Sequence, residues 1–165
     1  MKRLVPYVRG MRWVIDMSEL NYDALKLKNQ LCFPLYACSR GVIKQYKPFL
    51  DEIDLTYTQY IAMLALWENK EMTVKELGDA LYLDSGTLTP LLKKLENKGY
   101  VTRTRSRKDE RNLIVAVTEQ GEEIKNKALQ MQQEIEAHTE IPKEAAAILY
   151  RALYEILGRL SECNK

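Results

Sequence analysis

The sequence is poor in the residues that build metal sites and disulfide frameworks. Its 165 residues include one histidine, His138, which leaves no ordinary His-rich zinc site and no histidine-based triad. The three cysteines are too few, and their number is odd, for a secreted disulfide scaffold. No apolar run reaches the roughly 18 residues that a membrane span needs. We therefore expect a cytoplasmic protein without a metal or other cofactor and without a membrane partner.

The chain also lacks the strong positive charge of a uniformly basic nucleic-acid binder, because its formal net charge is only +2 at pH 7. Residues 1–16 hold four of the 25 Lys/Arg residues and one of the 23 Asp/Glu residues, which leaves the rest at net −1. Any contact with DNA must therefore come from a local patch. We interpret residues 1–16, which precede Met17, as a non-native or wrongly assigned extension, so the domain is expected to span 17–165.

The sequence does contain apolar residues at helical spacing. Its composition, 46% hydrophobic and 29% charged, is typical of a single globular domain. Apolar spacing and capping signals predict helices over about 31–51, 56–69, 73–83, 85–98, 119–138 and 142–162. The last of these carries an apolar stripe that is too extensive for a lone surface helix. A second subunit is the simplest partner for it.

Prolines and caps sharpen the ends of the predicted helices. Pro34 is tolerated only in a first turn, so the first helix should begin within a residue or two of Cys32. Thr56 and Thr73 each precede a Gln or Glu by three residues and predict capping boxes. Pro90 requires the fourth helix either to begin near Thr87 or to be kinked.

The spacing of apolar residues changes after Gly99 from that of a helix to that of a strand. Residues 101–105 alternate between side-chain types, and residues 113–117 are rich in residues that favour β-strands. The segment between them, SRKDERN, makes a hairpin with a basic tip. Two short helices followed by a charged hairpin are the arrangement of a winged helix-turn-helix, expected over about 56–118. Such a fold is mainly α with a small β-hairpin. Its second helix fits the major groove of DNA, and its hairpin reaches phosphate or the minor groove.

Candidate DNA contacts are short hydroxyls and basic side chains, which bind base edges and phosphate. They are Ser85, Thr87, Thr89, Lys93 and Lys94 on the helix, and Arg105, Arg107, Lys108, Asp109 and Arg111 in the hairpin. The alternative interpretation is an ordinary solvated basic loop. Asp109 either orients the Arg111 side chain for the groove or forms a chance pair worth under about 1 kcal/mol.

With these motifs in place, the chain resembles the MarR family of bacterial winged-helix regulators. DSGTLTPLLKKLE followed by KDERNLIVAVTEQG resembles, more narrowly, the OhrR branch, which senses organic hydroperoxides. The resemblance is close over about 26–130, and the combination of NQLCF with LDSGTLTPLLKKLE is its most specific part. It implies a homodimer formed through helices 31–51 and 119–162, bound to a pseudo-palindromic operator in double-stranded DNA.

The resemblance also implies that Cys32 is the thiol that reacts with peroxide. Independently, a thiol reacts as the thiolate, and the unpaired amides and dipole of a helix N-terminus favour that anion. The alternative is a buried, inert cysteine, because free cysteine is among the most buried residue types.

Three tyrosines match the family positions whose hydroxyls hydrogen-bond the reactive sulfur, some of them from the partner subunit: Tyr36, Tyr46 and Tyr57. Tyr36 follows Cys32 by one helical turn. Tyr46 is about 21 Å from Cys32 along a straight helix, so it could reach only a partner's sulfur. The alternative is that these are ordinary core or interface tyrosines.

Oxidised Cys32 needs a second thiol to form a disulfide. Cys38 lies about 9 Å further along the helix and on another face, too far for the roughly 7 Å between Cα atoms that a disulfide tolerates. Cys163 is the candidate resolving thiol of a two-cysteine mechanism. We favour a one-cysteine mechanism in which a low-molecular-weight thiol is the partner.

These observations predict a redox-sensing repressor that is not an enzyme and that releases DNA when organic hydroperoxide oxidises Cys32. One alternative is a MarR-type regulator that binds a small aromatic ligand in the dimer cleft. A thiol peroxidase is the other, but it would leave the basic hairpin unexplained.

Overall fold

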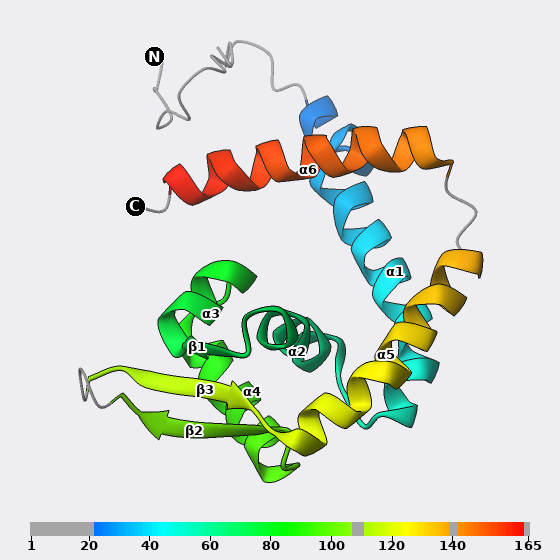
Figure 1. Ribbon diagram of the computed structural model, residues 1–165. Helices are drawn as coiled ribbons and strands as arrows, with labels where there is room; N and C mark the ends of the chain where they lie inside the picture. Colours follow the sequence, from blue (N-terminus) through cyan, green and yellow to red (C-terminus); the bar gives the residue numbers. More distant parts are fainter. Residues whose placement is uncertain (1–21, 107–110, 139–141, 164–165) are drawn as a thin grey trace. The chain divides into compact units, whose positions relative to one another are not determined.

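The computed structural model describes residues 22–106, 111–138 and 142–163 (Figure 1). The chain divides into two compact units, and each is described by itself. One unit is Cys38–His138, and the other combines residues 1–37 with residues 139–165. The helix α1 (Cys32–Glu52) begins in the second of these and continues into the first. Its start at Cys32 confirms the position that Pro34 predicts.

The Cys38–His138 unit contains the predicted succession of helices and strands. After α1 come α2 (Tyr57–Asn69), α3 (Val74–Leu81) and α4 (Ser85–Asn97). The strands β2 (Val101–Arg105) and β3 (Leu113–Val117) form the hairpin, and α5 (Glu119–His138) follows directly. The order helix, helix, helix, hairpin is that of a winged helix-turn-helix.

The predicted capping boxes are present at α2 and α3, and a hydroxyl cap also starts α5. The Thr56 hydroxyl accepts from Gln59 N at 3.3 Å, and Gln59 Oε1 accepts from Thr56 N at 2.9 Å. Thr73 and Glu76 make the equivalent reciprocal pair at α3. At α5 the Thr118 hydroxyl accepts from Gly121 N at 3.0 Å. Each cap satisfies backbone donors that a helix start leaves unpaired.

Helix α4 begins at Ser85, with Asp84 as its N-cap, and not near Thr87. Pro90 is therefore the sixth residue of the helix, and the prediction that would place it in the first turn is wrong. Because Pro90 has no N–H, the carbonyl of Gly86 receives no bond from it. The helix ends at Asn97, and Gly99, two residues further on, has a φ of 76°, the left-handed conformation that glycine adopts without steric cost.

A third strand, β1 (Glu71–Thr73), pairs antiparallel with β3, and the sheet order is β1-β3-β2. The sequence does not indicate this strand, because three residues are too short for a period-two pattern and Thr73 is also the N-cap of α3. Lys70 turns the chain into the strand with φ 66°, and its carbonyl accepts from Val117 N at 3.1 Å. The strand anchors the start of α3 to the hairpin.

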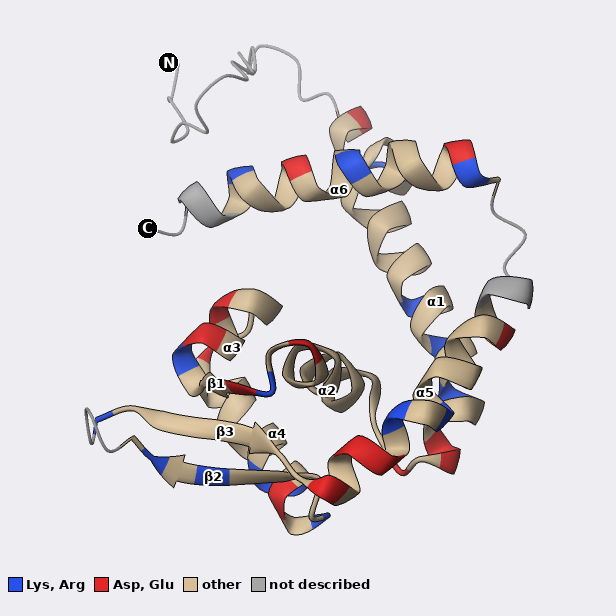
Figure 2. Ribbon diagram, viewed as in Figure 1, with Lys and Arg blue, Asp and Glu red and all other residues tan. Residues whose placement is uncertain are grey.

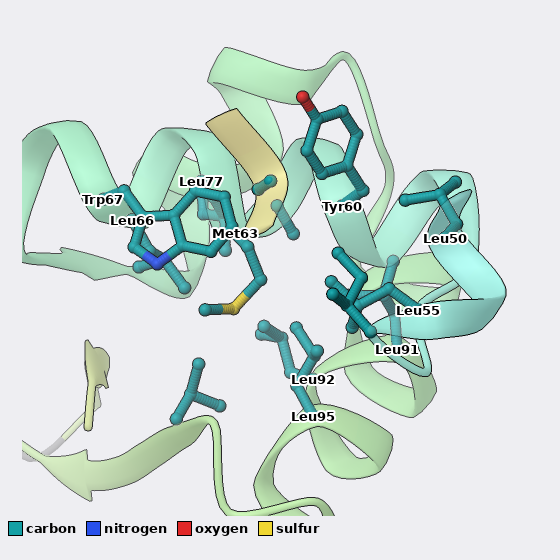
Figure 3. Packing of buried hydrophobic residues seen from close by; sticks show 14 of the residues in the cluster. Leu50, Leu55, Tyr60, Met63, Leu66, Trp67, Leu77, Leu91, Leu92 and Leu95 are labelled. Carbon is teal, nitrogen blue, oxygen red and sulfur yellow. The ribbon is translucent and has the colours of Figure 1, made fainter. Parts of the chain in front are cut away.

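The core of this unit lies among α2, α3, α4 and the sheet (Figure 3). The predicted apolar face of α4 is buried, with Leu88, Leu91, Leu92 and Leu95 at 7% exposure or less. They meet Met63 and Leu66 of α2, both fully buried. This packing fixes the outward face of α4, which carries the candidate DNA contacts.

The other unit contains two short 3-10 helices, η1 (Tyr22–Leu25) and η2 (Leu27–Asn29), and the long helix α6 (Lys143–Cys163). The apolar stripe predicted for α6 is exposed within this chain: Ile148 is 63% exposed and Leu160 55%. Helices with this much exposed apolar surface are typical of an interaction face.

Candidate functional site

The exposed surface of α4 carries all five hydroxyl and lysine side chains that the sequence predicts for it: Ser85, Thr87, Thr89, Lys93 and Lys94. Two of the hydroxyls already donate within the helix start. The Thr87 hydroxyl donates to Asp84 Oδ2 at 2.8 Å, and the Thr89 hydroxyl donates to the Ser85 carbonyl at 2.7 Å. To donate to phosphate, each must first rotate away from that acceptor.

The electrostatics of the α4 start follow from its cap. Hydrogen bonds from the Thr87 hydroxyl and the Thr87 amide hold the pKa of Asp84 below its usual range. Asp84 therefore stays ionised at the N-terminus of the helix that faces outward. Its charge stabilises the helix start, and the positive charges needed for DNA must come from Lys93, Lys94 and the hairpin.

In the hairpin, Arg105 and Arg111 are exposed. Ser106 N donates to the Asn112 carbonyl at 2.9 Å, which extends the pairing of the two strands beyond Arg105 and Leu113. The predicted contacts Arg107, Lys108 and Asp109 lie outside the described residues, so the Asp109–Arg111 pair does too. Figure 2 marks Lys and Arg positions in blue on the ribbon of β2.

One basic residue of β2 has a structural partner. Arg103 Nε and Nη2 donate to Glu96 Oε2 at 2.9 and 2.5 Å, which ties the hairpin to α4. These hydrogen bonds hold the pKa of Glu96 below its ordinary value. Sequence alternation alone placed Arg103 in the strand and gave no signal for this bridge.

A cleft of about 520 Å³ lies between α3, α4 and the hairpin. Its lining brings together Ser85 and Thr89 of α4 with Arg111 of the hairpin. Residues 22 and 26 positions apart in the chain therefore share one surface, as a winged helix requires. The same cleft adds Lys75 of α3, which sequence reasoning did not select.

Cys32 is the first residue of α1 and is exposed, so the described chain does not bury it as an inert cysteine. Its Sγ lies 3.9 Å from Gln30 Oε1. Cys38 is also exposed. Cys163 is the last residue of α6, and its side chain lies outside the described part of the structure.

The predicted tyrosines separate into two groups. Tyr36, on α1, is 59% exposed. Tyr46 of α1 and Tyr57 of α2 pack edge to face, with ring centroids 5.2 Å apart. Tyr60 completes a cluster with them, at 5.9 Å from Tyr46 and 6.4 Å from Tyr57.

Tyr60 was not selected from the sequence, although its position three residues after Tyr57 on a helix was a signal for a shared face. Burial, followed by the charges of Tyr46 and Tyr57, raises the pKa of Tyr60 to about 12. The phenol therefore stays protonated across the physiological range. The Tyr46 and Tyr60 hydroxyls each lie 3.5 Å from Gln132 Oε1, another residue that sequence reasoning missed.

The three tyrosines line one end of a cleft of about 650 Å³ between α1, α2 and α5. Leu64 and Leu129 line it further along, and Trp67 lies towards the start of α5. Trp67 Nε1 donates to the Gly121 carbonyl at 2.8 Å, which holds α2 against α5. The cleft thus combines phenol hydroxyls with an apolar wall, a surface suited to a small molecule that has one polar end.

Within residues 22–106, 111–138 and 142–163, no group of three or more His, Cys, Asp or Glu side chains is placed to hold a metal ion. In that same portion of the chain, every helix is too short or too polar to cross a membrane.

Comparison with known proteins finds transcriptional regulators along most of the chain. Residues 44–128 match the family described as transcriptional regulator SarA/Rot. The organic hydroperoxide resistance transcriptional regulator of Bacillus subtilis (strain 168) is 48% identical over 146 residues, which are 88% of this chain and 99% of that protein. The HTH-type transcriptional regulator SarZ of Staphylococcus aureus (strain USA300) is 55% identical over 100 residues, 61% of this chain and 68% of that protein.

Among solved structures, reduced AbfR bound to DNA has a TM-score of 0.69 and 34% identity, with 82% of this chain and 95% of that chain covered.

Proposed function

The chain belongs to the SarA/Rot family of MarR-type winged-helix transcriptional regulators, and we propose that it is a repressor that leaves its operator when organic hydroperoxide oxidises Cys32. Like its relatives, it is a DNA-binding regulator and not an enzyme. The observation that carries the proposal is the exposed Cys32 at the first residue of α1, in a chain that also holds a tyrosine-lined cleft. As a regulator of transcription with unpaired thiols, it works in the cytoplasm.

The protein works as a homodimer. Support comes from the apolar side chains that α1 and α6 leave exposed in one chain, among them Phe33 at 42%, Ile148 at 63% and Tyr154 at 54%. Contiguous apolar surface of this kind costs free energy in water and is covered by a partner. A dimer with two-fold symmetry presents two copies of α4 to successive major grooves about 34–36 Å apart, so its operator is pseudo-palindromic.

On the operator, α4 enters the major groove and the hairpin contacts phosphate or the minor groove. Lys93, Lys94, Arg105 and Arg111 are the exposed cations of that surface among the described candidates. Arg107, Lys108 and Asp109 are proposed to extend it at the hairpin tip, with Asp109 orienting Arg111.

The sensing step is attack of the Cys32 thiolate on the outer oxygen of the hydroperoxide. The O–O bond breaks, sulfur is oxidised to a sulfenic acid, and the organic fragment leaves as an alcohol after taking a proton. A low-molecular-weight thiol then condenses with the sulfenic acid, forming a mixed disulfide and releasing water.

Tyrosine hydroxyls bind the sulfur during this reaction. Tyr36 follows Cys32 by one turn of the same helix. Tyr46 and Tyr57 line the 650 Å³ cleft of one subunit and receive Cys32 of the partner subunit. The organic part of the peroxide lies along the apolar wall formed by Leu64 and Leu129.

Release of DNA follows from a difference in stability between two conformations of the dimer. The dimer has a conformation that binds DNA and one that does not. Oxidation can shift the population towards the second only by as much as the modified sulfur stabilises it relative to the first. A displacement of the two α4 helices from one-turn spacing is enough to lose one half-site.

The test is a DNA-mobility assay of reduced and cumene hydroperoxide-treated protein on the region upstream of its own gene. Wild type should release DNA, and Cys32→Ser should bind it with or without peroxide. If Cys32→Ser still releases DNA on oxidation, the mechanism is wrong.

The tyrosine-lined cleft also favours a second candidate, regulation by a small aromatic acid. Salicylate added to the same two proteins separates the alternatives. Release by salicylate that survives Cys32→Ser would support the ligand mechanism, whereas the redox mechanism predicts no release by salicylate.

A further inference from the structure

Gln132 of α5 lies at the tyrosine end of the 650 Å³ cleft. Its Oε1 is the acceptor for the Tyr46 hydroxyl and for the Tyr60 hydroxyl, each at 3.5 Å. Tyr46 comes from α1 and Tyr60 from α2. One side chain of α5 therefore contacts phenols from two other helices.

The Tyr46 phenol has a single proton to donate. It can direct that proton to Gln132 Oε1 or to the sulfur of Cys32 of the partner subunit, but not to both. An O···O separation of 3.5 Å is long for such a bond, so the hydroxyl can leave Gln132 at low cost. Tyr46 is thus placed to exchange one acceptor for another.

We propose that Gln132 is a positioning residue that competes with the Cys32 sulfur for the Tyr46 hydroxyl. The inference rests on the proposed function, because it takes Cys32 as the thiol that Tyr46 meets. In the reduced protein a Cys32 thiolate would be a stronger acceptor than an amide oxygen, so the sulfur and Gln132 share the hydroxyl, with the sulfur favoured. In the mixed disulfide the sulfur is neutral and accepts only weakly, so the hydroxyl returns to Gln132.

The exchange has a structural consequence for the DNA-binding unit. When Tyr46 bonds to Gln132, α1 is linked to α5, and α5 begins two residues after the hairpin strand β3 ends. The oxidation state of the sulfur thereby determines whether a hydrogen bond forms between the sensing helix and the helix that continues from the hairpin.

The experiment measures the reactivity of reduced Cys32 with iodoacetamide at neutral pH, followed by mass spectrometry of the peptide that contains Cys32. Only the thiolate reacts. Gln132→Leu removes the competing acceptor, so Tyr46 bonds to sulfur more completely and the thiolate fraction rises. We expect alkylation to become roughly two- to fivefold faster, as one ordinary hydrogen bond allows.

A double-mutant cycle with Tyr46→Phe separates competition from a general structural effect. In the Tyr46→Phe background there is no hydroxyl to compete for, so Gln132→Leu should leave the rate unchanged. Gln133→Leu is the matched control, because Gln133 is the next residue of α5, is exposed, and does not line the cleft. Gln132→Met, which keeps an unbranched chain of similar length, replaces Gln132→Leu if thermal unfolding shows that the leucine variant is poorly folded.

An unchanged or slower rate in the Gln132 variant would overturn the inference, and so would equal acceleration with and without the Tyr46 hydroxyl. The assay uses neither DNA nor peroxide. Its failure is therefore distinguishable from failure of the proposed function, which is decided by DNA release from Cys32→Ser.

Discussion

The salt dependence of operator binding gives a quantitative test of the DNA-binding surface. Lys94 of α4 and Arg111 of the hairpin are both exposed and belong to the two elements proposed to contact DNA. Replacing both with alanine removes two positive charges from each protomer and therefore four from a homodimer. Each phosphate contact contributes about 0.9 to the slope of log K against log salt concentration, so the slope should fall in magnitude by about 3.6.

This change in slope is large enough to measure without knowing the absolute affinity. Between 50 and 200 mM salt, the double variant should lose about 150-fold less affinity than the wild type does. The assay is fluorescence anisotropy of reduced protein with labelled operator at several KCl concentrations. It measures the electrostatic part of binding directly.

The matched control is Lys44→Ala combined with Lys47→Ala, which removes the same charge from exposed positions on α1. Lys47 is paired there with Asp51 at 2.8 Å. The control should keep the wild-type slope within about one unit. An unchanged slope in the Lys94 and Arg111 variant, or an equal decrease in the control, would refute the assignment of α4 and the hairpin as the DNA contacts.

Three further outcomes are expected. Leu92→Ala removes a side chain that is 1% exposed, and it should lower the free energy of unfolding in urea by about 2–5 kcal/mol; a loss below about 1 kcal/mol would contradict the core described for α4. Because Thr87 holds the pKa of Asp84 below its usual value, the Asp84 cap should stabilise the fold fully above about pH 4 and lose that contribution as pH falls through the lower folded-state pKa. Asp84→Asn should remove this component from acid unfolding followed by circular dichroism, and an unaltered acid transition would argue against the cap. Non-reducing electrophoresis after peroxide treatment without added thiol should show monomers for wild type and Cys163→Ser alike, whereas a covalent dimer that needs Cys163 would establish the two-cysteine mechanism.

Local signals in the sequence were sufficient for the elements that they specify directly. Capping boxes at Thr56 and Thr73, the proline at position 34 and the glycine at position 99 each specify a helix end within one or two residues. The charged segment between two β-prone runs was enough for the hairpin. These features depend on backbone donors, fixed φ angles and short-range pairing, which neighbouring residues determine.

Features that depend on tertiary contacts were not accessible in the same way. The strand β1 exists because Glu71–Thr73 finds an open edge of β3, and nothing within three residues indicates that partner. Gln132 meets Tyr46 across 86 positions of the chain. The bond between Trp67 and Gly121 spans 54 positions. Such contacts arise from how helices pack, and a residue type alone does not predict them.

The candidate site also combines residues that local sequence signals associate with residues that only tertiary contacts bring together. Cys32 and Tyr36 are related by one helical turn, so the sequence could associate them. Tyr60 and Gln132 belong to the site because α2 and α5 pack together, which no local sequence signal indicates. The hydroxyls of Thr87 and Thr89, which are candidate DNA contacts, also donate at the helix start, because short side chains near an N-terminus bond to the local backbone and cap.

The most direct test of the account compares two quantities in one titration: the fraction of Cys32 oxidised, from peptide mass, and the fraction of operator released, from mobility shift. Cumene hydroperoxide is added stepwise to the DNA-bound wild-type protein with a low-molecular-weight thiol present. The account predicts that release rises together with Cys32 oxidation and is complete when Cys32 is fully modified. Release while Cys32 is still reduced, or full oxidation of Cys32 with the operator still bound, would contradict it.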